Sequence, residues 1–375
     1  MSEWRQATLD QLVRLQRGHD LPTAQRRPGN VPVLGSAGQS GVHDTSLVKG
    51  PGVVVGRAGS SMGTATYSDV DFWPLNTSLY VTDFLGNHPR FTFYLLSYMD
   101  FSGYNSGAAQ PMLNRNYIKG ISVQIPPPGE QQAIANALGA LDDKILANEQ
   151  LSSTHELLLQ CKFNQLGLSE EPDPAAGIPV TDLITFNPQT ERPTSEKPIY
   201  VDMAALSTSR ASITSWTRRA PKSGTRFRNG DTLFARITPC LENGKTGYVD
   251  FMESGEIGLG STEFIVMRTT ADAPSELAYF LARDARFCEH AMRNMIGSSG
   301  RQRVSAVDAS NYIVNAPDSD RLSTFGEEAA QAFAHWRSLE IENRTLAELR
   351  DTLLPQLVTG KIRVKDAERI VEDAT

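Results

Sequence analysis

Residues 126–151 read PPPGEQQAIANALGALDDKILANEQL, and this stretch decides the fold because it predicts one long amphipathic helix after a proline run. Its apolar side chains recur at the spacing of one helix face. They are Ile134, Leu138, Leu141, Ile145 and Leu151. Asn148 falls on the same apolar seam. A helix of this kind is unstable alone, so we expect the seam to be buried against a partner.

A second helix of the same kind is predicted about 195 residues further on. Its apolar positions are Ala329, Phe333, Trp336, Leu346 and Leu353. Asn343 takes the place of Asn148. Thr324 followed by Glu327 has the spacing of a capping box and predicts the start of this helix, and Gly360 predicts its C-terminal end. The two helices are the obvious packing partners of each other.

A Gly-rich, strand-like region precedes each helix, so the chain repeats a globule–helix unit. Residues 53–55 and 79–81 predict buried strands in the first globule, as 232–234 and 263–267 do in the second. We therefore expect an α+β fold, with two pseudo-repeated globular domains separated by two long coiled-coil helices. The expected boundaries are 1–128, 129–166 (central helix), 167–319, 320–358 (C-terminal helix) and 359–375 (a short charged tail).

Short segments of the two globules can be matched with each other. Gly56-Arg57 corresponds to Ala235-Arg236, and 75–79 corresponds to 260–264. Ser106-Gly107 before 116–118 corresponds to Ser299-Gly300 before 311–313. The loops between these segments differ, which is expected of two domains that bind different ligands. A duplication that has drifted without functional consequence would look the same.

Composition limits the classes of function. With 375 residues and 40% hydrophobic residues, each half can bury a core. The formal charge of −7 gives no general nucleic-acid signature, so such a role must rest on local basic clusters. The three cysteines show no metal-binding spacing and fit a reducing cytoplasm. Neither a signal peptide nor a membrane span is expected, so we predict a cytoplasmic protein with no membrane partner.

Catalytic motifs fail on inspection. Gly244-Lys245-Thr246 resembles the end of a P-loop, but Pro239 stands where the first glycine belongs. Asn187 begins a stretch that lacks the rest of an adenine methyltransferase motif. HExxH and nucleophile-elbow patterns are missing from the sequence. We therefore expect no catalytic residue, no metal site and no cofactor bound by this chain, which favours a binding or scaffolding protein.

Basic and amide side chains in polar loops are the candidate nucleic-acid contacts, because arginine and glutamine can bond phosphates or base edges. In the second globule they are Arg218, Arg219, Lys222, Arg226, Arg236, Lys245, Arg301, Gln302 and Arg303. In the first they are Arg26, Arg27, Arg57, Asn105, Gln110, Asn114 and Arg115. An ordinary solvated surface remains the alternative for the arginines. Turn amides that cap their own backbone remain the alternative for the amides.

The seam residues of the helices are candidates for helix–helix packing or subunit docking. They are Ile134, Leu138, Leu141, Ile145, Asn148, Phe333, Trp336, Asn343, Leu346 and Leu353. An asparagine within an apolar seam costs stability but fixes the register of the helices. Asn148 and Asn343 either serve this purpose or lie at the edge of the seam.

Three groups of motifs resemble the specificity subunits of type I restriction-modification systems. Residues 127–135 (PPGEQQAIA) with 141–148 resemble the central conserved region of that family, and 349–362 resemble its C-terminal region. Residues 50–57 (GPGVVVGR) and 72–77 (FWPLNT) are typical of one group of its target-recognition domains. The second helix departs from the pattern, since it opens with 326–329 (GEEA) and not with a proline-rich segment.

The resemblance implies a non-catalytic subunit whose two target-recognition domains read a bipartite, asymmetric sequence in double-stranded DNA. The helices would be antiparallel and would dock two N6-adenine methyltransferase (modification) subunits, with motor-nuclease (restriction) subunits added. S-adenosylmethionine, ATP and Mg²⁺ would then be bound by those partners. Residues that contact bases are not carried over, because these loops vary within the family.

Two readings compete with this one. The first is a two-headed scaffold that binds protein or glycan and never DNA, which the absence of a neighbouring methyltransferase gene would favour. The second is a standalone DNA-binding regulator. The lack of a helix-turn-helix pattern and the two long helices that need partners argue against the regulator.

Overall fold

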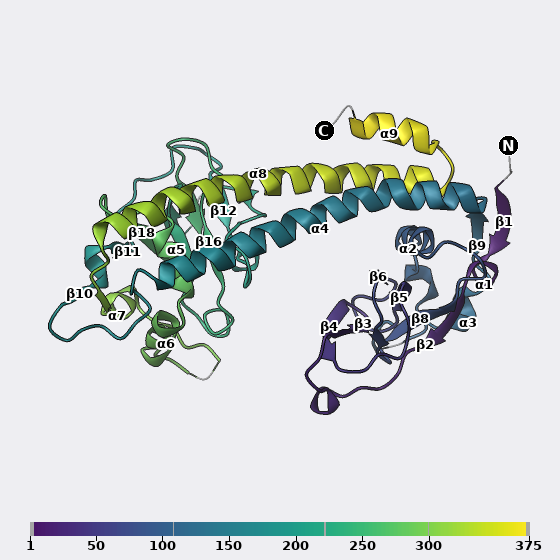
Figure 1. Cartoon of the computed structure of the whole chain (residues 1–375), viewed down its shortest axis with the longest axis horizontal. Coiled ribbons are helices and arrows are strands. Elements are labelled where there is room, and N and C mark those ends of the chain that lie inside the picture. The colour runs from purple at the N-terminus through teal and green to yellow at the C-terminus, as the bar shows by residue number, and fades with distance from the viewer. Residues whose placement is uncertain (1–3, 108, 221–222, 299, 373–375) are drawn as a thin grey trace. The chain divides into compact units, whose positions relative to one another are not determined.

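The computed structural model describes residues 4–107, 109–220, 223–298 and 300–372 (Figure 1). The chain divides into two compact units. Unit 1 contains Met1–Ile145 and Thr345–Thr375, and unit 2 contains Leu146–Arg344. The long helices α4 (Pro128–Asn164) and α8 (Ser319–Val358) each contribute to both units.

Unit 1 contains a four-stranded antiparallel sheet in the order β2-β8-β5-β6. Its central strand β5 is fully buried, as expected of a valine run covered on both faces. A three-stranded sheet has the order β4-β3-β7, and β1 pairs with β9. The bounds are β1 Arg5–Thr8, α1 Leu9–Leu12, β2 Arg14–Arg17, β3 Val31–Gly35, β4 Gly38–His43, β5 Gly52–Gly56, β6 Ala65–Ser68, β7 Trp73–Pro74, β8 Ser78–Asp83, α2 Pro89–Tyr98, α3 Arg115–Ile118, β9 Ser122–Ile125 and α9 Val364–Glu372.

Unit 2 repeats this plan. One sheet has the order β11-β18-β15-β16, a second has the order β13-β12-β17-β14, and β10 pairs with β19. The bounds are β10 Gly177–Pro179, β11 Ile184–Phe186, β12 Ile199–Val201, β13 Thr217–Arg218, β14 Thr225–Phe227, β15 Thr232–Ala235, β16 Thr246–Tyr248, β17 Gly258–Gly260, β18 Phe264–Thr269, α5 Leu277–Arg283, α6 Ala285–Arg293, α7 Ala306–Ser310 and β19 Ile313–Asn315. Both second sheets also contain one parallel pair, β3 with β7 and β12 with β17. The predicted internal repeat is therefore confirmed.

Backbone hydrogen bonds give the residue-by-residue match of the two units and correct two predicted matches. The N–H of Arg57 bonds the carbonyl of Thr77, as the N–H of Arg236 bonds the carbonyl of Glu263. Arg57 and Arg236 are thus equivalent, but 75–79 matches 261–265, one residue later than predicted.

The second correction concerns 116–118. The N–H of Leu113 bonds the carbonyl of Arg57, as the N–H of Val304 bonds that of Arg236. It follows that 116–118 matches 307–309, whereas 311–313 follows α7 and leads into β19. The shared Asn-Tyr-Ile letters misled because they lie in a helix in one unit and after a helix in the other. The N–H of Ser106 bonds the carbonyl of Met112, as the N–H of Ile296 bonds that of Arg303, so Ser106 is equivalent to Ile296. Ser299, with which Ser106 was matched in the sequence, lies outside the described residues.

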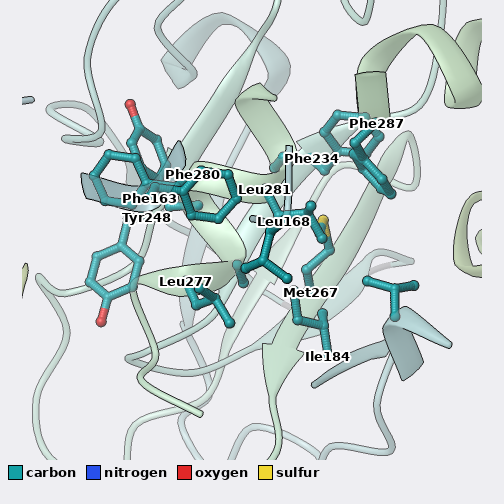
Figure 2. Packing of buried hydrophobic residues seen from close by; sticks show 14 of the residues in the cluster. Phe163, Leu168, Ile184, Phe234, Tyr248, Met267, Leu277, Phe280, Leu281 and Phe287 are labelled. Atoms are coloured by element: carbon teal, nitrogen blue, oxygen red, sulfur yellow. The ribbon is translucent and has the colours of Figure 1, made fainter. Parts of the chain in front are cut away.

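The core of unit 2 joins the helix pair to the sheet (Figure 2). Every residue of α5 from Leu277 to Ala282 is buried. The ring of Phe280 stacks on Phe163 of α4 at 6.0 Å and meets Phe325 and Phe333 of α8 edge-on. α5 therefore helps to fix the globular part of unit 2 to α4 and α8.

The helices are antiparallel in both units. In unit 1, Arg350 bonds Asp142 at 2.8 Å, and Leu138 and Leu353 share one core. In unit 2, Asn148 bonds Asn343 at 2.8 Å, and further along α4 Lys162 bonds Glu328. Asn148 is only 3% exposed, so it lies within the seam and not at its edge.

Three predictions about the helices are wrong. α8 begins at Ser319, where Asp318 accepts a hydrogen bond from the N–H of Arg321 at 3.0 Å; Thr324 lies inside the helix and bonds the carbonyl of Asp320. Leu151 is 39% exposed and is not part of the seam. The tail is not merely a charged segment, since α9 buries Ala367 in the core of unit 1. Within the described residues, no helix has the length and apolar run needed to cross a membrane.

Candidate nucleic-acid interface

A hairpin closed by Ile296 and Arg303 holds the three candidates Arg301, Gln302 and Arg303 in unit 2. Ile296 and Arg303 exchange two backbone hydrogen bonds of 2.9 Å. Gln302 exchanges two hydrogen bonds of 3.1 Å with Thr238, one backbone to backbone and one to the hydroxyl. The hairpin is therefore fixed to the residues that follow β15. Its side chains project from a backbone that is held in place.

The guanidinium of Arg303 is paired with the carboxylate of Glu263. Nε of Arg303 lies 3.0 and 2.8 Å from the two oxygens of Glu263, and Nη2 lies 2.7 Å from one of them. The hydrogen bond from Arg303 lowers the pKa of Glu263, and nearby Arg236 lowers it further. Glu263 therefore stays ionised at neutral pH, and the pair carries no net charge.

The other basic candidates of unit 2 have individual partners around the second sheet. Arg218 pairs with Glu256 at 2.7 Å, and the guanidinium of Arg219 lies 3.3 Å from the ring centre of Tyr200. Two further bonds end on backbone carbonyls: Arg226 to Thr190 at 2.9 Å and Lys245 to Met203 at 2.9 Å. Lys222 lies outside the described residues. The described basic candidates of unit 2 thus lie partly around the second sheet and partly on the hairpin.

In unit 1 the equivalent hairpin runs from Ser106 to Met112. The N–H of Ser106 bonds the carbonyl of Met112 at 2.8 Å, and the N–H of Gly59 bonds that of Pro111 at 3.0 Å. The side-chain oxygen of Asn105 accepts bonds from the N–H groups of Gly107 and Met112. That amide therefore caps its own turn, which leaves Gln110 as the exposed amide of this hairpin.

Arg57 lies beneath this hairpin. Its Nη2 is 3.4 Å from the sulfur of Met112, and its Nη1 is 3.4 Å from the carbonyl of Asn76. Burial lowers the pKa of Arg57, and the positive charge of Arg17 adds to the effect. Arg17 was not among the predicted site residues, although its strand places it beside β8.

The remaining candidates of unit 1 have local structural roles. Arg27 pairs with Asp44 at 2.5 Å, and Arg26 bonds the carbonyl of Ser40 at 2.7 Å. Arg115 bonds the carbonyl of Leu15 at 3.2 Å. Asn114 caps α3 through the N–H of Asn116, as Ser305 caps the equivalent α7. The structure thus brings Arg57 and Gln110 to one hairpin and leaves Arg26 and Arg27 on the smaller sheet.

Sequence inspection missed two features of the unit 2 hairpin. Glu263, which neutralises Arg303, lies 40 positions away in the sequence. Ile296 is 77% exposed beside Arg303, an unusual place for a large apolar side chain. Glu263 could have been noticed because it directly precedes β18, at the position equivalent to Thr77 in unit 1.

The segments that resemble catalytic motifs have structural roles, as a turn and as a hydrogen-bond acceptor. Gly244 forms a turn with a φ of +71°, and β16 begins two residues later at Thr246, so the helix of a P-loop does not follow. The side-chain oxygen of Asn187 accepts a bond from the N–H of Val266 at 2.9 Å. In the part of the chain that the structure describes, no three His, Cys, Asp or Glu side chains gather as metal ligands would.

The predicted docking residues of the helices are used inside the two units. Ile134, Leu138, Leu141, Leu346 and Leu353 are buried in the core of unit 1, with Ile145 packed against it, and Phe333 and Trp336 are buried in the core of unit 2. Other apolar side chains of α4 are exposed: Leu146 at 51%, Leu157 at 66% and Leu158 at 54%. The exposed apolar residues of α4 in unit 2 are thus not the residues of the predicted seam.

Parts of this chain are similar in sequence to proteins of known function. Residues 1–155 match the family described as the type I restriction modification DNA specificity domain. The chain is 26% identical over 212 residues to the specificity subunit of the Escherichia coli type I restriction enzyme EcoEI, covering 54% of this chain and 35% of that protein. The EcoAI specificity subunit from the same organism gives 26% over 211 residues, 54% and 36%. These alignments span about a third of either relative.

Among solved structures, the S subunit of a type I restriction-modification system from M. genitalium superposes with a TM-score of 0.60. The match has 16% identity and covers 95% of this chain and 96% of that one, which shows a shared fold. The resemblance seen in the sequence is confirmed: residues 1–155 match the family of type I restriction-modification DNA specificity domains, and the chain shares the fold of an S subunit of such a system.

Proposed function

We propose that this chain reads a bipartite, asymmetric sequence in double-stranded DNA on behalf of a type I complex, with unit 1 reading one half and unit 2 the other. Two modification subunits, each an N6-adenine methyltransferase, dock on it, and motor-nuclease restriction subunits complete the complex. The chain itself is non-catalytic and acts in the cytoplasm. S-adenosylmethionine, ATP and Mg²⁺ belong to the partners.

The proposal rests on the internal repeat. The hairpins of the two units have equivalent backbone positions but carry different side chains at them. The two hairpins share equivalent backbone hydrogen bonds, from the N–H groups of Ser106 and Ile296 to the carbonyls of Met112 and Arg303. At equivalent positions unit 1 has Thr77 and Met112 where unit 2 has Glu263 and Arg303. Since base edges are read by the hydrogen-bonding and apolar character of side chains, such differences on one frame suit two distinct half-sites.

Charge supports a role within a complex. The net charge of −7 gives little electrostatic attraction to DNA, and several arginines are neutralised by carboxylates. Partner subunits would supply much of the contact with phosphates. The exposed leucines of α4 in unit 2, Leu157 and Leu158, offer an apolar surface for such a partner.

The test is genome-wide mapping of N6-methyladenine in cells with and without this gene. We expect one bipartite motif, with an unread spacer, to lose methylation when the gene is deleted and to regain it on complementation. Deletion of the gene for the proposed modification subunit is the matched control and should remove the same motif. Identical methylation with and without the gene would contradict the proposal and favour a scaffold with no DNA role.

A further inference from the structure

We propose that Arg303 reads a guanine in the half-site of unit 2 and that Glu263 holds its guanidinium in the reading position. The inference rests on the proposed function and adds to it a named base and a pair of residues. Its physical basis is a fork-to-fork contact between Arg303 and Glu263 at the base of an exposed hairpin.

The contact with Glu263 occupies one edge of the guanidinium and leaves another open. Glu263 accepts from Nε and Nη2 of Arg303 at 2.7 to 3.0 Å. The carbonyl of Arg301 accepts a longer bond of 3.3 Å from Nη1. A guanidinium has five N–H donors, so one hydrogen on Nη1 and one on Nη2 remain. Since the Arg303 side chain is 42% exposed, these donors can reach a ligand.

Guanine suits the remaining donors better than phosphate does. The ion pair with Glu263 has no net charge, so it gains little from the counterion release that drives phosphate binding. The carboxylate would also repel a phosphate placed beside it. Guanine presents two acceptors, O6 and N7, in the major groove, and two parallel N–H groups of arginine match them.

The internal repeat argues against a purely structural role for the pair. Unit 1 closes its hairpin with the equivalent bond from the N–H of Ser106 to the carbonyl of Met112, while the side-chain oxygen of Asn105 takes the place of the second backbone acceptor. It has Thr77 in place of Glu263 and Met112 in place of Arg303. The frame therefore does not need an ion pair at this place. Both members of the pair differ between the units, as expected if they act together on the ligand of unit 2.

The first measurement is the methylated motif in cells that carry the whole system. Arg303→Lys keeps the charge but removes the fork. We expect it to relax one guanine in one half-site, with about 5- to 150-fold less discrimination against other bases there. Glu263→Gln should relax the same position more weakly, because it loosens the guanidinium without removing it. The other half-site should keep its sequence in both variants.

Two variants keep the test interpretable. Arg293→Lys is the matched control, because Arg293 also pairs with a glutamate, Glu289, but lies on α6 outside the hairpin. It should leave the motif unchanged. Glu263→Thr combined with Arg303→Met copies the pair of unit 1, so the frame should fold, which thermal unfolding of the purified complex would check.

The outcomes separate the inference from the function beneath it. If the wild-type gene specifies no methylated motif, the proposed function fails. If it specifies a motif that Arg303→Lys leaves intact, or if the folded double variant loses methylation at all sites equally, Arg303 is not a base reader. Relaxation at a position other than guanine would also overturn the inference.

Discussion

The side-chain amide of Asn148 donates to the side-chain oxygen of Asn343 at 2.8 Å within unit 2, across the seam between α4 and α8. A second bond of 2.7 Å links the same amide to Glu342. With Asn148 only 3% exposed, this is a buried polar contact in an apolar seam. Such contacts fix helix register because shifting the helices would leave the amides without partners.

Asn148→Ala should destabilise the protein by about 1–3 kcal/mol, because it leaves buried polar groups of its partners unsatisfied. The measurement is chemical unfolding of the purified protein. Gln150→Ala, on an exposed position of the same helix, is the control and should change stability by less than about 0.5 kcal/mol. Equal effects of the two substitutions would show that the seam contact contributes nothing.

The helices were predictable because their pattern is local. The positions of Ile134, Leu138, Phe333 and Trp336 on one face follow from spacing alone. The pattern also placed Asn148 and Asn343 at equivalent positions, but it left open whether they lie within the seam or at its edge. Helix ends were harder, since Thr324 with Glu327 has a capping spacing but Asp318 provides the cap. Local letters do not show which of several possible caps the backbone uses.

The site was less predictable because its contacts join distant positions. Strand register depends on hydrogen bonds between segments far apart in sequence, so the match of the two units around Thr77 was wrong by one residue. In the same way, Arg303 was predicted as a nucleic-acid contact without its partner Glu263, whose carboxylate neutralises it. Basic residues can be counted in a sequence, but their charge balance requires the fold.

A buried ion pair at the start of β15 gives a larger expected effect. Asp231 is fully buried and binds Arg268 through both oxygens at 2.6 and 2.8 Å. Asp231→Asn should cost about 3–5 kcal/mol, because it leaves the guanidinium of Arg268 without its counter-charge. The control is Glu289→Gln, which removes an exposed pair with Arg293 and should cost less than about 1 kcal/mol in the same unfolding experiment.

Asp250 should make stability depend on pH. Burial raises its pKa to about 6, although Arg337 opposes the shift. The folded state therefore holds this proton more tightly than the unfolded state, in which the carboxyl has its ordinary pKa of 3.8. Its contribution to stability is present below about pH 4 and is lost as pH rises to about 6.

Asp250→Asn removes that loss. We expect the variant to be more stable than the wild type by about 3 kcal/mol at pH 7.5, with the difference disappearing near pH 4. Unfolding curves across this range measure it. A constant difference at all pH values would mean that titration of Asp250 is not the cause. Asp272→Asn is the control, as Asp272 is exposed, and should show no such pH-dependent difference.

The last prediction concerns the exposed face of α4 in unit 2. Leu157 and Leu158 are 66% and 54% exposed, and exposed apolar groups on a helix favour a protein partner. Replacing both with glutamate should leave folding intact, because neither side chain contributes to the core. It should weaken copurification with the modification subunit at least tenfold, since burying two carboxylates in an interface without partners is costly. Ile296→Glu is the matched control: this residue is 77% exposed but lies on the hairpin, so copurification should persist. If the double variant copurified as well as the wild type, the modification subunit would have to dock elsewhere, and these leucines would be ordinary exposed residues.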